Sequence, residues 1–155
     1  METAQKITPF LWFNGNVEEA VNYYTSIFKN SRILNVSRIP DGKTMMATLI
    51  IEGQQFMLLD GGPQFPFTEA VSFMVNCETQ EEVDDLWGKL TANGGQESMC
   101  GWLKDKFGLS WQITPKILLK LMADPDREKS NRVMQAMMQM RKIDIKKLQE
   151  AYDNQ

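Results

Sequence analysis

Two hydrophobic periods divide the first 60 residues into strands and one helix. Residues 7–14, ITPFLWFN, form an apolar and aromatic run typical of a buried strand. Residues 17–30 instead repeat apolar side chains every three or four positions, which predicts an amphipathic helix. Three further strands, separated by Gly- and Pro-containing turns, are predicted at 31–39, 44–53 and 55–60.

The start of the predicted helix carries local signals. Asn16 precedes the first apolar position, where its side chain is expected to cap free backbone N–H groups. Glu18 and Glu19 follow in the first turn, where the helix dipole favours acidic side chains.

The second half of the chain repeats this order of elements. Residues 69–77 predict a strand, and residues 79–95 predict a helix that begins with Thr79 as cap and Glu82 in the capping-box position. Short extended segments follow up to residue 115, and the run Lys104–Lys106 between them is expected to be a solvated turn.

Offset comparison supports a duplication. A shift of 63 residues places ITPFLWFN over AVSFMVNC (70–77), and a shift of 54 places FMLL (56–59) over SWQI (110–113). We interpret the chain as a tandem βαβββ repeat of the α+β class, with modules at residues 1–65 and 66–115.

Residues 116–155 differ from both modules because they are helical throughout, with a break at Asp124-Pro125. Their apolar stripes are expected to cover the outer sheet or a partner subunit, so this C-terminal extension favours a homodimer. The methionines are expected to fill a core or a subunit contact rather than an adaptable binding face. They are Met122, Met134, Met137, Met138 and Met140.

Charge and composition argue against several classes of partner. Residues 1–115 hold 8 Lys and Arg against 14 Asp and Glu, whereas residues 116–155 hold 9 against 6. The acidic first part argues against nucleic-acid binding, which needs clustered cations. No apolar run reaches the roughly 18 residues that cross a bilayer, and METAQKITPF lacks signal-peptide features. With no disulfide framework either, we expect a cytoplasmic protein without membrane partners.

The chain contains no histidine. Ser-His-Asp and Cys-His sites are therefore impossible within it, and the commonest general base and metal ligand are missing. Two cysteines, Cys77 and Cys100, cannot form a zinc site by themselves.

Two stretches resemble a known superfamily. A strand ending in WFNGN before VEEAVNYYTSIF resembles the opening of vicinal oxygen chelate proteins, which include glyoxalase I and bleomycin-resistance proteins. The stretch CGWLKDKFGLSWQITP and the tail after it resemble the PhnB-like family, often given the domain name 3-demethylubiquinone 3-methyltransferase. This resemblance implies that the modules form a cupped mixed β-sheet around a cavity, usually completed by dimerisation.

The resemblance also implies where a site would lie. In the superfamily's metal enzymes, ligands come from the first and fourth strands of each module. The two offsets place these positions near Pro9, Leu58, Ser72 or its neighbour Val71, and Gln112. Asp60 would share the face of Leu58 by strand alternation, but with Gln112 it makes only two ligands. We therefore predict neither metal nor cofactor.

Aromatic and sulfur-containing residues complete the candidates. Trp12 and Phe13 are adjacent, so strand alternation lets only one of them face the cavity. Gln112 points into the cup if Trp111 and Ile113 pack under helices, where a ligand, a neighbouring strand or water would pair its amide. Cys100 is the more accessible thiol. The candidate ligand contacts are Gln112, Asp60, Trp12, Phe13, Leu58, Ser72, Trp102 and Cys100.

Two functions remain open. The first is a binding protein that holds a small, partly aromatic or anionic molecule in its β-cup without metal. The alternative is an isomerase or lyase of the vicinal oxygen chelate type, and whether the chain is an enzyme stays open. Methyl transfer is not expected, because the chain lacks a G-x-G-x-x-G motif and room for a doubly wound sheet.

Overall fold

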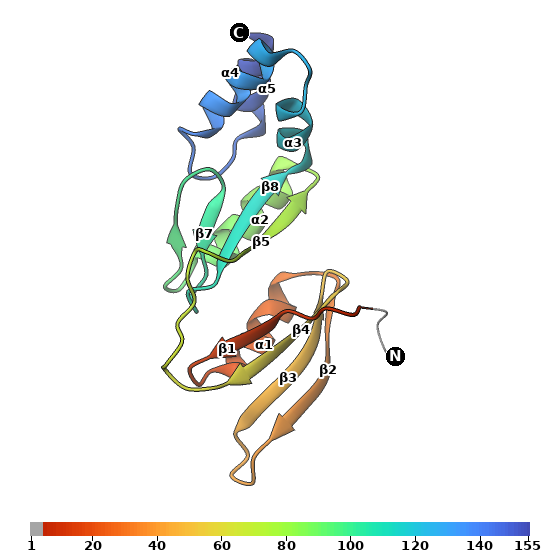
Figure 1. Ribbon diagram of the computed structural model, residues 1–155, viewed down its shortest axis with the longest axis vertical. Helices are drawn as coiled ribbons and strands as arrows, with labels where there is room; N and C mark the ends of the chain where they lie inside the picture. The colour runs from red at the N-terminus through yellow and green to blue at the C-terminus, as the bar shows by residue number, and fades with distance from the viewer. Residues whose placement is uncertain (1–4) are drawn as a thin grey trace. The chain divides into compact units, whose positions relative to one another are not determined.

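The computed structural model describes residues 5–155 and forms two compact units. One ends at Phe67 and the other spans Thr68–Gln155 (Figure 1). Each unit combines a four-stranded mixed sheet with helices, as the α+β prediction requires.

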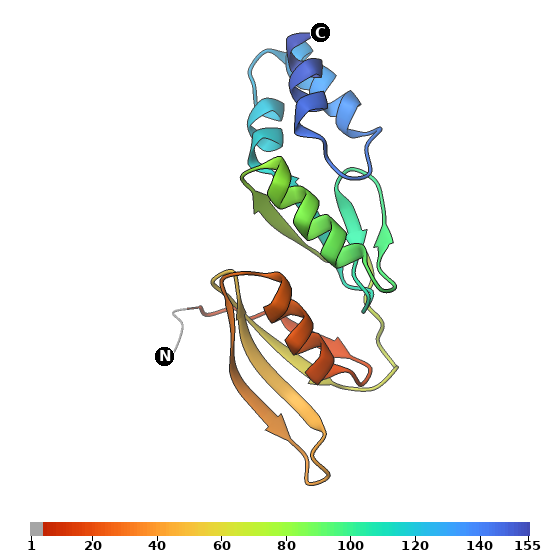
Figure 2. The same ribbon diagram turned by 180° about the vertical axis from the view of Figure 1, so that it is seen from behind.

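The first unit has the predicted order of elements. They are β1 (Phe10–Phe13), α1 (Val17–Ile27), β2 (Ser31–Arg38), β3 (Thr44–Ile51) and β4 (Gln54–Asp60). The sheet order is β1-β4-β3-β2, with β1 parallel to β4 and the other neighbours antiparallel. Helix α1 lies across one face of this sheet (Figure 2).

The second unit repeats that topology and adds three helices. Its elements are β5 (Ser72–Cys77), α2 (Gln80–Thr91), β6 (Gln96–Glu97), β7 (Trp102–Lys104), β8 (Ser110–Pro115), α3 (Lys116–Met122), α4 (Arg127–Met137) and α5 (Ile145–Asp153). The sheet order β5-β8-β7-β6 matches that of the first unit, and α2 lies across one face (Figure 2). The predicted βαβββ duplication is confirmed.

The pairs of neighbouring strand residues in the two units are related by the two sequence offsets. Residues related by an offset, however, point to opposite faces of their sheets. Phe10 pairs with Met57 in the first unit and Phe73 with Trp111 in the second, which are shifts of 63 and 54 residues. Trp111 is buried in the core of its unit, whereas its counterpart Met57 is half-buried beside the fully buried Leu58. A one-residue difference reverses the face of every side chain in a strand. Leu58 and Gln112 are therefore aligned in sequence but lie on opposite faces.

Helix α2 begins as predicted, whereas α1 does not. The hydroxyl of Thr79 accepts a hydrogen bond from the backbone N–H of Glu82 at 3.1 Å, and the Glu82 carboxylate accepts one from the N–H of Glu78 at 2.8 Å. Asn16 precedes α1 with a left-handed φ of 54°, and its side chain makes no cap hydrogen bond. The expected Asn16 cap is wrong because capping side chains need an extended backbone at that position.

The turn between β7 and β8 is built around a buried carboxylate. Asp105 is only 2% exposed and accepts hydrogen bonds from the backbone N–H groups of Phe107 at 2.9 Å and Leu109 at 3.1 Å. Its other oxygen accepts the indole N–H of Trp111 at 2.9 Å. The expectation that Lys104–Lys106 is a solvated turn is therefore wrong for Asp105, because local donors satisfy the carboxylate inside the protein.

The C-terminal helices form a small core of their own. Their buried residues are Leu118, Leu121, Val133, Met140, Ile143 and Leu148, with Met122 and Met137 packed against them. The apolar stripes thus pack mainly on one another and not across the sheet. Of the methionines, Met134 and Met138 remain 38% and 49% exposed.

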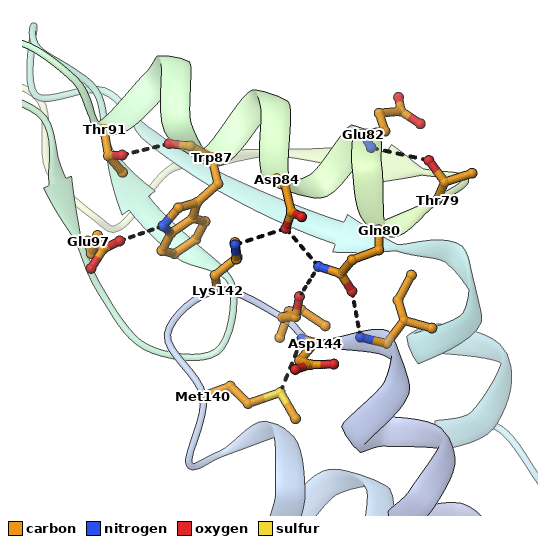
Figure 3. Close-up of polar contacts among 12 residues, drawn as sticks. Thr79, Gln80, Glu82, Asp84, Trp87, Thr91, Glu97, Met140, Lys142 and Asp144 are labelled. Atoms are coloured by element: carbon orange, nitrogen blue, oxygen red, sulfur yellow. Dashed lines mark hydrogen bonds and ion pairs between the residues drawn. The ribbon is translucent and has the colours of Figure 1, made fainter.

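Hydrogen bonds attach this extension to the rest of the second unit. The amide of Gln80, at the start of α2, accepts the N–H of Ile145 at 2.7 Å and donates to the carbonyl of Ile143 at 2.9 Å (Figure 3). It also donates to Asp84, which pairs with Lys142 at 2.9 Å.

A second attachment joins backbone to backbone. The N–H groups of Cys100 and Gly101 donate to the carbonyls of Met140 and Arg141 at 2.7 and 2.8 Å. Gly101 has a φ of 83°, and a Cβ there would approach the carbonyl of Ile113 to 3.0 Å and the side chain of Ile143 to 3.1 Å. This crossing therefore requires glycine.

Asp60 ties together three parts of the first unit. Its side chain is 8% exposed, pairs with Lys43 of the β2–β3 hairpin at 2.7 Å and accepts the backbone N–H of Gly15 at 2.8 Å. The bond from Lys43, followed by that from Gly15, lowers the pKa of this carboxyl.

We expect Asp105→Asn to lower the free energy of unfolding by about 1–3 kcal/mol. If the asparagine oxygen keeps the two backbone donors, its NH₂ group faces the indole N–H of Trp111, and two donors are left buried together. Urea unfolding measures the loss. The control is Asp85→Asn on α2, whose half-exposed carboxylate pairs with Lys89 at 3.1 Å and whose loss should change stability little. Equal stability of the two variants would contradict a structural role for Asp105.

Asp60→Asn is expected to lower the melting temperature at pH 7 and to lose this effect in acid. The folded pKa of Asp60 is below its ordinary value of 3.8, so its stabilisation is present above that value and disappears as pH falls through the folded pKa. Thermal melts of both proteins between pH 7 and 2.5 measure the narrowing gap. Glu18→Gln, which removes an exposed pair with Arg38, is the matched control. A gap that stays constant with pH would show that the charge of Asp60 is not responsible.

Candidate ligand-binding site

The sheet of the second unit has one face covered by α2 and one without a helix (Figures 1 and 2). The covered face carries buried Leu103, Trp111 and Ile113. We call the other face the open face. By alternation and register it carries Ser72 and Met74 of β5, Trp102 and Lys104 of β7, and Ser110 and Gln112 of β8.

Gln112 and Ser72 are hydrogen-bonded to each other on the open face. The Gln112 amide donates a hydrogen bond to the Ser72 hydroxyl at 2.9 Å, between the parallel strands β8 and β5. Among residues 5–155, no donor pairs with the Gln112 amide oxygen, and the Ser72 hydrogen is free to donate. The pair therefore offers one acceptor and one donor to a bound molecule.

Apolar surface flanks this polar pair. Trp102 is the direct cross-strand neighbour of Gln112 and is half-buried. Met74, on the other side, is 44% exposed. An indole and a thioether beside an amide suit a small molecule with both an aromatic part and a polar group. The structure thus brings three predicted residues, Ser72, Trp102 and Gln112, onto one surface.

Cys100 does not join this group. It lies in the left-handed turn before β7 with a φ of 60°, bonded through its backbone to Met140. The other thiol, Cys77, is fully buried, and burial raises its pKa to about 12, so it is unreactive at neutral pH.

The predicted residues of the first unit divide between the two faces of its sheet. Phe13 and Leu58 are 3% and 0% exposed and belong to the core beneath α1. Leu58, a predicted ligand contact, therefore lies in the core in this structure, and the positions beside it on the uncovered face are Met57 and Leu59. Asp60 is engaged by Lys43 and Gly15.

Trp12 lies on the uncovered face of the first sheet. Its indole N–H donates to the carbonyl of Gly62 at 2.9 Å, and its ring meets Phe65 edge-on at 5.1 Å. Gly61 makes room for the ring, since a Cβ there would lie 2.1 Å from it. Of the adjacent residues Trp12 and Phe13, only Trp12 can therefore line a cavity on the uncovered face.

The donors on the open face do not match a divalent metal. Ser72 and Gln112 are neutral and bonded to each other, whereas catalytic sites for such ions use about three imidazole, thiolate or carboxylate ligands. Within residues 5–155, no three His, Cys, Asp or Glu side chains are grouped to hold an ion. We derive no metal chemistry for this face.

Sequence reasoning missed Lys104 and Ser110 on the open face. Lys104 was assigned to a turn, but it ends β7 opposite Ser110. Ser110 precedes Gln112 by two residues on the same strand, so alternation alone places both side chains on one face.

One family model matches most of the chain. It is described as 3-demethylubiquinone-9 3-methyltransferase and covers residues 5–114. The match ends one residue before the end of β8, so the C-terminal tail, which contributed to the resemblance, lies outside it. No curated protein matches.

Solved structures share the fold. A protein from Bacillus cereus, described as a putative 3-demethylubiquinone-9 3-methyltransferase, PhnB protein, is 42% identical; the alignment covers 72% of this chain and 99% of that one, with a TM-score of 0.67. PA1353 from Pseudomonas aeruginosa is 23% identical over 72% of this chain and 98% of its own, with a TM-score of 0.60.

A more distant neighbour has the same fold. It is a variant of the fosfomycin resistance protein FosX from Listeria monocytogenes, complexed with Mn(II) and 1S,2S-dihydroxypropylphosphonic acid. It is 14% identical over 70% of this chain and 90% of its own, with a TM-score of 0.52, and this likeness shows the fold alone. Because the family model spans residues 5–114 and the Bacillus relative is 42% identical, this chain belongs to the PhnB-like family, described as 3-demethylubiquinone-9 3-methyltransferase.

Proposed function

We propose that this protein binds a small, partly aromatic or anionic molecule on the open face of its second sheet, without a resident metal ion. The observation that carries the proposal is the Gln112–Ser72 pair, set between Trp102 and Met74 on a face that no helix covers. Buried or half-buried amides need partners, and this pair leaves an acceptor and a donor directed at a ligand.

The chemistry named in the family description receives no support from the fold. Methyl donors of the nucleoside type bind doubly wound parallel sheets with a glycine-rich first turn. Each sheet here is four-stranded and mixed, and each has one helix across one face. We therefore propose binding and not methyl transfer.

Two further parts of the proposal concern the setting of the protein. We propose a homodimer, supported by the half-exposed methionines Met134 and Met138 on the extension. We also propose a cytoplasmic location, supported by the two free cysteines. In the part of the chain that the structure describes, no helix is both long and apolar enough to cross a membrane.

The proposal is tested first with benzamide, a neutral aromatic amide. In ¹⁵N-labelled protein, we expect benzamide to shift the side-chain amide signal of Gln112 and the indole signal of Trp102. Gln112→Ala should weaken binding about fivefold, the effect of one lost hydrogen bond. Gln135→Ala, at an exposed position of α4, is the matched control. Shifts confined to other residues would overturn the proposed site.

Metal content distinguishes the binding protein from the alternative isomerase or lyase. We expect elemental analysis of the purified chain to find no stoichiometric metal, and nickel, zinc, manganese and iron(II) to leave its melting temperature unchanged. Stoichiometric metal, or stabilisation by one of the four ions that Gln112→Ala abolishes, would favour the metal-dependent enzyme.

A further inference from the structure

Ser110 carries a buried hydroxyl group that has no hydrogen-bond partner among residues 5–155. The residue is 1% exposed, and its Oγ makes no hydrogen bond to any described residue. A buried hydroxyl that bonds to nothing loses the hydrogen bonds it would make to water, so each such group calls for an explanation.

A hollow of about 180 Å³ lies against Ser110. This volume exceeds that of several water molecules and accommodates a group of a few heavy atoms. The residues around it come from the segment before β5, from β6 and the connection after it, from β7 and from the start of β8. They are Glu69, Gln96, Glu97, Ser98, Trp102, Leu103, Lys104 and Ser110. Trp102 connects the hollow with the Gln112–Ser72 pair, because it is the cross-strand neighbour of Gln112.

The positively charged side chain beside the hollow, Lys104, is already paired with a carboxylate of the same chain. Lys104, the cross-strand neighbour of Ser110, forms an ion pair with Glu69. The Glu69 side chain is 61% exposed, and exposed ion pairs of this kind contribute little to stability. A carboxylate from another molecule can therefore displace Glu69 from Lys104 at small cost.

The second carboxylate beside the hollow is held by other partners. Glu97 accepts the indole N–H of Trp87 at 2.7 Å (Figure 3) and lies 3.8 Å from the guanidinium of Arg141. These contacts offset its charge, so Lys104, the Ser110 hydroxyl and the amide of Gln96 remain as donors for an anion.

We propose that the hollow is the carboxylate subsite of the ligand, and that Glu69 occupies it when no ligand is bound. This inference rests on the proposed function and narrows the ligand class to small aromatic carboxylic acids. The ligand carboxylate replaces Glu69 on Lys104 and accepts the hydroxyl of Ser110, while its aromatic part lies along Trp102 towards Gln112. Glu69 thus acts as an internal competitor.

The experiment compares benzoate binding to the full chain and its variants by calorimetric titration. Glu69→Gln removes the competing charge and should tighten benzoate binding about three- to tenfold. Ser110→Ala should weaken it about fivefold, and Lys104→Gln about tenfold or more. The matched control is Glu78→Gln, which removes a similar exposed ion pair, with Lys116, away from the hollow and should leave affinity unchanged.

A stability measurement checks the state of Ser110 independently. Since its hydroxyl has no partner, Ser110→Ala should leave the melting temperature unchanged or raise it, in contrast to most buried polar replacements. A clear loss of stability would show that the hydroxyl is already satisfied, which would overturn the proposal.

Binding of phenylphosphonate, benzylamine and benzamide, each compared with benzoate, separates this inference from the proposed function. Phenylphosphonate tests whether any oxyanion suffices, and benzylamine tests the opposite charge. The carboxylate subsite would be overturned if benzylamine or phenylphosphonate bound more tightly than benzoate. It would also be overturned if Glu69→Gln left the affinity for benzoate unchanged. If benzamide still shifts Gln112 in that case, the proposed function stands alone.

Discussion

The carboxylate of Asp105 organises the strand that carries the candidate site. It is almost completely buried, so each of its oxygens must find a donor within the protein. Two backbone N–H groups close the turn before β8, and the indole of Trp111 binds the second oxygen. That last bond fixes Trp111 on the covered face. Since neighbours alternate along a strand, Ser110 and Gln112 must then project from the open face.

The core beneath the sheet therefore determines which side chains project from the open face. Gln112 is positioned less by its own contacts than by Trp111 and Ile113, which are 3% and 0% exposed. The same logic operates in the first unit with the opposite result. There Leu58 enters the core, and Met57 and Leu59 point the other way. Two copies of one fold thus present chemically different faces: an apolar one beside Trp12 and a polar one around Gln112.

The order of the strands and helices could be predicted from sequence because it depends on local periodicity and turn residues. The same two offsets relate the observed pair Phe10–Met57 to the observed pair Phe73–Trp111. The face of each side chain could not be transferred between the repeats, since a single position reverses it. Asp105 was missed because its sequence context, between two lysines, is typical of a solvated turn. Only the three-dimensional convergence of Phe107, Leu109 and Trp111 on its carboxylate reveals it as buried.

The hydrogen bonds that attach the C-terminal extension depend on the number of residues in the segment 140–145. Cys100 and Gly101 contact residues 140 and 141 through backbone atoms alone, and Gln80 contacts the backbone of residues 143 and 145. These particular hydrogen bonds use only backbone atoms of residues 140–145, so they do not depend on the side chains there, although Met140 and Ile143 also belong to the buried core. An inserted or deleted residue there, however, would put every one of these bonds out of register at once. The length of this segment is therefore expected to be constrained independently of its buried side chains, Met140 and Ile143.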